Sequence, residues 1–251
     1  MTGVVLSYRG ASKRYVASHL GRTIVTRGVE DLTLEIRAGE AVGLLGLNGS
    51  GKTTTMKLSL GLLAPTTGSV EVFGAPAGSR DSRRLIGYLP EFPYFYPYLT
   101  PPEILRFFGR LSGLDARTLD QRIPETLKQV GLKEHQERRL AGFSKGMLQR
   151  VGMAQCLLHD PSLLLLDEPG SGLDPLAIAE FRELFVRLRE AGKALLVSSH
   201  SISEVERVCD RAAILVDGRL ARVVANAEWT GAGGRLEDIF VATVRPSAGK
   251  A

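Results

Sequence analysis

The sequence predicts an α/β fold with a mostly parallel sheet, an antiparallel β addition near the C-terminus and an inserted α-helical subdomain. Short apolar runs of strand length recur between helical segments, which is typical of a parallel sheet with helices on both faces. Between about Leu89 and Asp160 the apolar spacing becomes helical. Asp217-Gly218 stands between two apolar runs as a hairpin turn. We therefore expect one domain over 1–251, with an α/β core at 1–88 and 161–245, a helical subdomain at 89–160 and a flexible tail at 246–251.

Composition narrows the class of protein. The chain has 251 residues, of which 44% are hydrophobic and 24% charged, values that suit a packed globular domain. The net charge of +5 suits anionic partners, but the arginines are scattered. Cys156 and Cys209 lack the spacing of a disulfide framework or metal cluster, which favours a reducing cytosol. No segment approaches the ~18 apolar residues that a membrane span needs, so we expect that nothing here crosses a bilayer unaided.

The strands of the core are predicted in chain order. "LTLEI" at 32–36 alternates in polarity and predicts a half-buried strand, and "EAVGLLG" at 40–46 predicts a buried strand that ends in a glycine-rich turn. A helix is expected to start at Lys52 and end before Pro65. Further buried strands are predicted in "SLLLLDEP" from Ser162 and "ALLVSSH" from Ala194.

The middle of the chain predicts helices. Ile104, Phe107, Phe108 and Leu111 follow helical spacing, and Leu127, Val130 and, less cleanly, Leu132 repeat it. Four prolines are expected to act as helix breakers in this segment: Pro97, Pro101, Pro102 and Pro124.

"GLNGSGKT" at 46–53 matches the P-loop pattern, with a predicted strand before it and a predicted helix after it. The glycines let backbone N–H groups surround phosphate oxygens, and the helix N-terminus favours negative charge. Lys52 can reach the terminal phosphates, and the Thr53 hydroxyl can bind Mg²⁺. The sequence therefore predicts that the protein binds a nucleoside triphosphate, and the motif in this setting resembles that of P-loop NTPases, which implies a RecA-like core.

Asp167 and Glu168 end a buried apolar strand, at the sheet edge where open α/β folds bind ligands. Asp167 can hold the Mg²⁺ shell. Glu168 can orient or deprotonate a water aimed at the terminal phosphate. Acidic residues at strand ends are often only solvated, but together with a P-loop the pair predicts a catalytic centre.

Six segments, in this order, resemble the nucleotide-binding subunits of ATP-binding cassette (ABC) transporters. They are the P-loop, "YLPE" at 88–91, "FSKGMLQR" at 143–150, Asp167-Glu168, "SGLD" at 171–174 and His200. The sequence "SKGM", in place of the more usual SGGQ, resembles the corresponding segment of the bacterial ABC-2 type exporters. The resemblance covers nearly the whole chain.

The resemblance implies partners and a place in the cell. It implies a head-to-tail dimer around two MgATP, either a homodimer or a heterodimer with a paralogous ATPase subunit. It also implies a transmembrane permease subunit on a separate chain, a cytoplasmic protein peripheral on the inner face of the cell membrane, and export. No nucleic acid partner is expected. The alternatives are a non-transport ABC ATPase that acts on ribosomes or DNA, and an ATP-gated regulatory subunit without useful turnover.

The resemblance also implies roles for individual residues. Catalytic roles fall to Glu168, His200 and Lys52, and the metal ligands are Thr53, Asp167 and Glu91. Nucleotide binding is assigned to Tyr15, Gly46, Leu47, Asn48, Gly49, Ser50, Gly51, Lys52, Thr53, Thr54, Ser144, Gly146 and Asp174. Tyr15 would stack on adenine, although a longer segment than usual separates it from the next strand. Ser144 and Gly146 would face the other subunit's γ-phosphate, and Asp174 would link the two sites.

The sequence departs from the family pattern at three positions. Glu91 replaces the usual Gln, and either binds the metal or acts only as a hinge between the lobes. Lys145 and Met147 replace Gly and Gln. We expect ATP turnover to survive these replacements because Ser144 and Gly146 are retained.

Aromatic residues gather directly after Glu91, in "FPYFYPYLT" at 92–100. Such rings give a large contact area at low entropy cost, which suits a docking surface. We expect at least two of Tyr94, Phe95, Tyr96 and Tyr98 to dock the membrane partner. The alternative is that Phe92, Phe95 and some tyrosines fill the subdomain's own core.

Overall fold

The computed structural model describes residues 3–19, 22–230 and 234–245. Its main sheet has six strands in the order β10-β9-β3-β8-β7-β6. They are β3 (Ala41–Leu45), β6 (Ile86–Leu89), β7 (Leu163–Asp167), β8 (Ala194–Ser199), β9 (Arg211–Val216) and β10 (Arg219–Ala225). All neighbouring pairs are parallel except β9 and β10, which form the predicted antiparallel hairpin around Asp217-Gly218. The expected α/β fold with a parallel sheet is confirmed.

A second, antiparallel sheet of four strands has the order β2-β1-β4-β5. It comprises β1 (Val4–His19), β2 (Arg22–Arg37), β4 (Thr67–Val72) and β5 (Ala75–Pro76). Tyr8 and Ile36 from this sheet and Leu44 and Leu165 from the main sheet belong to one buried cluster, together with Met56 of α1 (Lys52–Ser59). Packing of both sheets around α1 fixes the position of the loop that precedes this helix.

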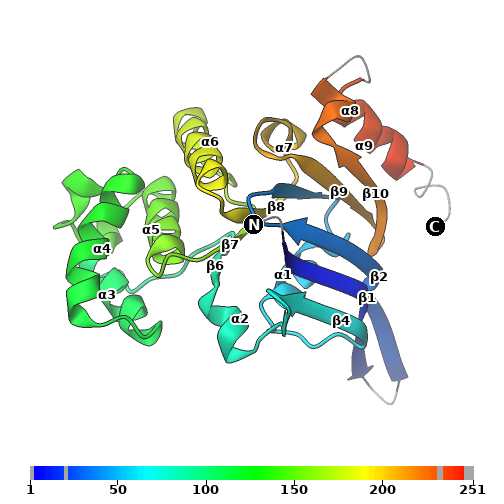
Figure 1. Cartoon of the computed structure of the whole chain (residues 1–251), viewed down its shortest axis with the longest axis horizontal. Helices are drawn as coiled ribbons and strands as arrows, with labels where there is room; N and C mark the ends of the chain where they lie inside the picture. The colour runs from blue at the N-terminus through cyan, green and yellow to red at the C-terminus, as the bar shows by residue number, and fades with distance from the viewer. Residues whose placement is uncertain (1–2, 20–21, 231–233, 246–251) are drawn as a thin grey trace.

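The helical subdomain occupies one end of the molecule (Figure 1). It contains α3 (Pro101–Leu111), α4 (Ala116–Gln129) and α5 (Lys145–Leu157), with short 3₁₀ turns at Lys133–His135 and Leu140–Gly142. Ile104, Leu119, Leu127 and Val151 are completely or almost completely buried between these helices. Because this cluster continues into Leu164 and Leu166 of β7, the subdomain is packed onto the core.

The other helices surround the main sheet. They are α2 (Arg80–Arg84), α6 (Pro175–Glu190), α7 (Ile202–Val208), α8 (Asn226–Thr230) and α9 (Leu236–Val244). Helices α6 and α7 lie side by side, and α9 contacts α7 and β9. Within the described ranges no helix has the length and apolarity to cross a membrane.

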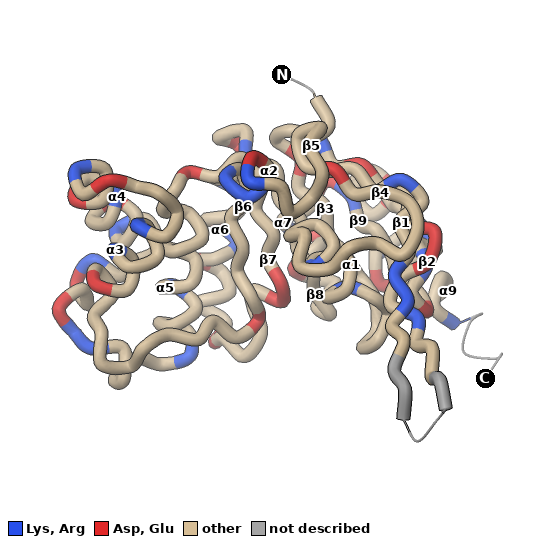
Figure 2. The backbone as a smooth tube through the Cα atoms, turned by 90° about the horizontal axis from the view of Figure 1, so that it is seen from below, with Lys and Arg blue, Asp and Glu red and all other residues tan. Residues whose placement is uncertain are grey.

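Several local expectations are wrong. The segment after Tyr15 is not a connection, because it continues β1 and pairs with β2 as a long hairpin that projects from the body (Figure 2). The helix after the P-loop, by contrast, agrees with its expected bounds, since it starts at Lys52 and ends at Ser59, before Pro65. Pro101 and Pro102 begin α3, where proline is tolerated because the first N–H groups have no helical partner. Pro124 lies inside α4, where it removes one backbone donor and crowds the carbonyl of the preceding turn, and the helix nevertheless continues to Gln129.

Two further differences concern side chains and the chain end. Phe107 and Leu111 follow the helical spacing of α3 but are 43% and 71% exposed, because Leu105 shares the buried face with Ile104 instead. The tail at 246–251 lies outside the described residues.

Candidate nucleotide-binding site

The P-loop connects β3 to α1 as the sequence predicts. Gly51 caps the helix in the left-handed region, with φ of 105°. A methyl group added there would lie 2.6 Å from the carbonyl oxygen of Gly28. Glycine is therefore required for the backbone to turn against β2 and to present its N–H groups at the helix N-terminus.

Lys52 is almost completely buried under this loop. Its Nζ donates to the Gly46 carbonyl at 2.7 Å and to the Leu47 carbonyl at 3.4 Å. The same Nζ lies 3.9 Å from Oε1 of Glu168. A buried ammonium at this place, within reach of the P-loop and of the β7 carboxylate, is suited to neutralise a phosphate.

A pocket of about 350 Å³ opens in front of the P-loop. This volume lies within the range of small-ligand sites. It is lined by the P-loop and by residues from four other segments: Tyr15, Thr26, Arg27, Gly28, Leu47, Asn48, Gly49, Ser50, Gly51, Lys52, Thr53, Thr54, Glu91, Asp167 and Glu168. The fold thus brings most of the predicted site residues together. Gly46, beside them, accepts from Lys52 and lines an adjoining pocket.

Asp167 is 7% exposed at the carboxyl end of β7. Its Oδ1 accepts a hydrogen bond from the Ser198 hydroxyl at 2.5 Å, across the register that pairs these two residues. Burial raises the pKa of Asp167, and the nearby carboxylates of Glu168 and Glu91 add to the shift, while Ser198 and Lys52 oppose it. A bound cation would reverse this balance because it favours the ionised carboxylate.

Glu168 has a left-handed backbone, with φ of 47°. Its N–H donates to both the carbonyl and the hydroxyl oxygen of Ser198, at 3.1 and 3.0 Å. Its Oε2 lies 2.7 Å from Nδ1 of His200 and accepts from the His200 backbone N–H at 3.2 Å. The Glu168 side chain is therefore held between β8 and the start of the segment that leads into α7.

A second pocket, of about 390 Å³, lies on the other side of Glu168. Glu91, Glu168 and Asn48 line both pockets, so the carboxylates stand at their boundary. His200 and Phe240 of α9 line only the second pocket. Sequence reasoning missed Phe240 because only packing of the C-terminal helix brings it to this edge.

Oxygen donors for a hard cation converge in the first pocket. Thr53, Glu91 and Asp167 line it together, and Oε1 of Glu91 accepts from the Ser171 hydroxyl at 3.3 Å. Mg²⁺ is typically held by one or two carboxylates plus waters and substrate phosphates, which this donor set fits. In the described part of the chain, no group of three or more His, Cys, Asp or Glu side chains is arranged to hold a metal ion.

Tyr15 also lines this pocket, beside Thr54 in the first turn of α1. Its hydroxyl lies 3.1 Å from Oγ1 of Thr54, and the side chain is 38% exposed. A methyl group at Gly28 would lie 2.7 Å from Cε2 of the ring. Thr26, Arg27 and Gly28 line the same pocket. Sequence reasoning missed them because it treated their segment as a connection, although "TIVTRGV" has the β-branched content of a strand.

Ser144, Gly146 and Asp174 do not line this pocket. Ser144 caps α5 by accepting from the Met147 N–H at 3.2 Å, and Asp174 caps α6 by accepting from the Ala177 N–H at 2.9 Å. Gly146 lies in the first turn of α5, where an added methyl group would lie 3.5 Å from Leu173. The chain therefore presents these three residues away from its own P-loop.

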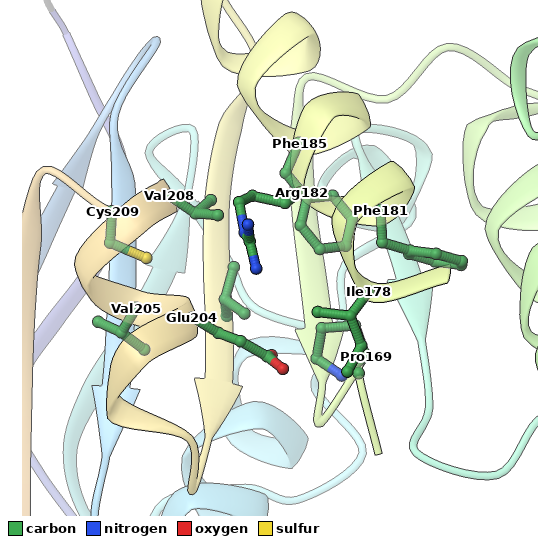
Figure 3. A pocket seen from close by; sticks show the side chains of 11 residues that line it. Pro169, Ile178, Phe181, Arg182, Phe185, Glu204, Val205, Val208 and Cys209 are labelled. Atoms are coloured by element: carbon green, nitrogen blue, oxygen red, sulfur yellow. The ribbon is translucent and has the colours of Figure 1, made fainter. Parts of the chain in front are cut away.

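A third pocket lies between α6 and α7 and is bordered by Pro169 and Gly170, which follow Glu168 in the chain (Figure 3). Arg182 of α6 and Glu204 of α7 point into it among apolar side chains that include Phe181, Phe185 and Val205. A methyl group at Gly170 would lie 2.8 Å from both carboxylate oxygens of Glu204. Burial raises the pKa of Glu204, Glu168 adds to the shift, and Arg182 and His200 oppose it. No sequence pattern predicts that Arg182 and Glu204 meet.

The aromatic segment divides between core and surface. Phe95 is 9% exposed and packs edge-on against Phe108 with ring centroids 6.2 Å apart, so it fills the subdomain's core as the alternative expected, and docking by at least two of the tyrosines stays a prediction. Phe92 is 67% exposed, so the alternative that it fills the core is also wrong. Tyr96 contacts both Tyr98 and Phe107. We call the exposed rings of Tyr94, Tyr96, Tyr98 and Phe107 the aromatic surface.

Comparison with known proteins gives one consistent group. The family model described as "ABC transporter" matches residues 29–171. An uncharacterized ABC transporter ATP-binding protein of Nostoc is 49% identical over 190 residues, which are 75% of this chain and 57% of that protein. The bacitracin transport ATP-binding protein BcrA of Bacillus licheniformis is 41% identical over 77% of this chain and 63% of its own length. The match thus spans less than two thirds of these relatives.

Solved structures agree with this grouping. The structure of an ATP-binding subunit of an ABC transporter has a TM-score of 0.81 at 32% identity, and the match covers 95% of this chain and 99% of that one. A dimeric ATP-binding cassette in a post-hydrolysis state, bound to ADP and Pi, has a TM-score of 0.79 at 25% identity, with 88% and 98% of the two chains covered. Both likenesses extend across the sheets and the helical subdomain.

Proposed function

Because the chain belongs to the ABC transporter family of ATP-binding proteins, we propose that it binds and hydrolyses ATP to drive a membrane permease on a separate chain. The observation that carries this proposal is the position of Glu168. Its carboxylate stands between the P-loop pocket and His200, with the Lys52 ammonium 3.9 Å away. A group that can take a proton from water is thus placed beside a group that can bind phosphate.

The proposed chemistry is an in-line displacement at the γ-phosphorus. The P-loop N–H groups and Lys52 hold the phosphates and stabilise the charge that develops on them. Glu168 orients a water and receives its proton as the new P–O bond forms and the bond to the ADP oxygen breaks. His200 keeps the Glu168 carboxylate turned toward the pocket. Mg²⁺, held by Thr53, Asp167 and Glu91, would neutralise phosphate charge.

A second cassette, either another copy of this chain or a paralogue, completes the proposed site. Ser144, Gly146 and Asp174 lie outside their own chain's pocket, which supports a role toward a partner's nucleotide. The start of α5 offers a helix N-terminus there, which favours a γ-phosphate. Shifting such a dimer from 1:99 to 99:1 in favour of the closed state requires about 5.5 kcal/mol of differential binding. Two sites with several charge-assisted hydrogen bonds of ~1.5–3 kcal/mol each can supply it.

The aromatic surface is the proposed docking site for the permease. Its three tyrosines lie within seven residues after Glu91, so nucleotide contacts at Glu91 and most contacts with the permease would involve the same short segment. The clustering of exposed tyrosines is typical of interface cores. We place the subunit in the cytoplasm at the inner face of the membrane, and we assign it to export because relatives include a Nod factor export ATP-binding protein of Cupriavidus pinatubonensis.

The test compares ATP hydrolysis by the purified chain with that of Glu168→Gln, and reads the mass of each in MgATP. We expect hydrolysis in the parent, its loss in the variant, and an ATP-trapped dimer of the variant. Glu183→Gln, on the exposed face of α6, serves as the matched control. A parent that binds ATP without hydrolysing it, alone or with its permease, would instead identify a regulatory subunit.

A further inference from the structure

Lys145 lies where three functional segments meet. It is the first residue of α5, between Ser144 and Gly146. Its side chain reaches Phe92, which follows the pocket residue Glu91, and it reaches Gly172 in the segment between Glu168 and Asp174. We call the contacts among 91–92, 145–146 and 171–173 the three-segment junction.

The contact with Phe92 is a cation–π interaction. Lys145 Nζ lies 4.9 Å from the centroid of the Phe92 ring, within the ~6 Å at which a cation is attracted to an aromatic face. The ring is otherwise 67% exposed. The attraction to the ammonium limits the rotation of the exposed Phe92 side chain. Lys145 therefore restrains the segment that carries Glu91.

The contact with Gly172 depends on glycine. Gly172 has φ of 68°, and a methyl group there would lie 3.2 Å from Cε and 3.3 Å from Cδ of Lys145, and closer still to Nζ. The lysine stem therefore runs directly across the Gly172 backbone. A short residue at position 145 would make neither this contact nor the contact with Phe92.

Hydrogen bonds join the same segments independently of Lys145. The Ser171 hydroxyl donates to Oε1 of Glu91 at 3.3 Å, and the Ser171 N–H donates to the Glu168 carbonyl at 3.0 Å. Gln149 of α5 donates from Nε2 to the Pro169 carbonyl at 3.3 Å. The junction thus reaches from the start of α5 to both carboxylate segments of the nucleotide site.

We propose that Lys145 is a positioning residue that fixes the start of α5 to the Glu91 and Glu168 segments of its own chain, so that the subdomain and the carboxylates are aligned together. This inference rests on the proposed ATPase function. The inference gives a reason for Lys145 at a position where the family usually has glycine. It also gives a reason why the Glu91 side chain stays at the pocket. The alternative role, a second cation for a partner's phosphate, is disfavoured because the ammonium engages Phe92 of its own chain.

The experiment is a double-mutant cycle with Lys145→Met and Phe92→Leu in the full chain. Both substitutions keep apolar bulk and remove the cation–π contact. We expect each to lower kcat about two- to fivefold with an unchanged KM for ATP, and the double variant to show no further loss. Lys145→Arg is expected to restore kcat, because guanidinium also binds aromatic faces. Lys133→Met, at an exposed lysine of the same subdomain, is the control.

Amide hydrogen exchange supplies a readout that does not need turnover. We expect faster exchange at 91–92 and 171–173 in both single variants, and parent-like exchange in Lys145→Arg and Lys133→Met. A raised KM for ATP in Lys145→Met but not in Phe92→Leu, effects on kcat that multiply, or unchanged exchange would each overturn the inference. A parent without ATPase activity would refute the proposed function. The exchange data alone would then test whether Lys145 holds the three-segment junction together.

Discussion

Glu168 and His200 are joined twice, through the His200 ring and through its backbone. Nδ1 of the ring lies 2.7 Å from Oε2 of Glu168, and the backbone N–H donates to the same oxygen at 3.2 Å. The backbone contact fixes the carboxylate even without the ring, whereas the ring adds orientation and can respond to charge. The ring contact and the backbone contact of His200 therefore contribute separately to holding the Glu168 carboxylate.

His200→Ala tests this separation. The ring contact disappears while the backbone N–H remains, so we expect kcat to fall about tenfold or more, but less than in Glu168→Gln, with ATP affinity nearly unchanged. Steady-state hydrolysis and equilibrium ATP binding measure the two quantities. Ser201→Ala is the neighbouring control. A loss as large as that of Glu168→Gln would show that the backbone contact does not hold the carboxylate.

Tyr15 should contribute to nucleotide affinity through its ring. Stacking of a base on an aromatic residue is worth about 1–3 kcal/mol, so Tyr15→Ala should weaken ATP binding about fivefold or more. Tyr15→Phe removes only the hydroxyl contact with Thr54 and should bind ATP within about twofold of the parent. Binding of a fluorescent ATP analogue measures both variants. Equal losses in the two variants would mean that the hydroxyl, and not stacking, is what matters.

The aromatic surface should be dispensable for hydrolysis and required for association with the permease. Tyr96→Ala with Tyr98→Ala removes two contacting rings that are 47% and 62% exposed. Basal hydrolysis is expected to stay within about twofold, because surface substitutions usually change stability little. Co-purification with the permease is expected to be lost, whereas Leu62→Ala, another exposed apolar position, should co-purify normally. Intact association of the double variant would refute the docking surface.

Glu204 should make stability depend on pH. Its folded pKa is raised by burial, so the protonated form is favoured in the folded state. Below the ordinary Glu pKa, about 4.3, Glu204 is protonated in both the folded and the unfolded state, so it costs no folding stability. As pH rises through the raised pKa, ionisation destabilises the fold. Glu204→Gln removes this loss and should raise the Tm by about 2 °C or more at pH 7.5, with no difference near pH 4.

Thermal unfolding of the purified chain at the two pH values measures this effect. Glu183→Gln, an exposed carboxylate on α6, should show no comparable rise at pH 7.5. A lower Tm of Glu204→Gln at pH 7.5 would mean that attraction to Arg182 outweighs the burial of Glu204.

Local chemistry explains why so much of the site was visible in the sequence. The P-loop needs glycines at fixed spacing, and Lys52, Thr53, Asp167 and Glu168 follow from strand ends and a helix start that apolar patterns mark. The buried strands at 41–45, 163–167 and 194–199 are continuous apolar runs because both faces of a parallel sheet are covered. For such elements, residue type and position in the chain are sufficient.

The sequence alone determined the α/β class, the P-loop, the order of the motifs and therefore the family. Tertiary structure decided which side chains share a space: Arg27 and Phe240 at the pockets, Arg182 with Glu204 between α6 and α7, Phe92 outside and Phe95 inside, and Lys145 across Gly172. It also decided that the segment after Tyr15 is strand. The physical reason is that motifs are set by neighbours along the chain, whereas burial and side-chain contacts depend on residues tens of positions apart, which only the packing of sheets and helices brings together.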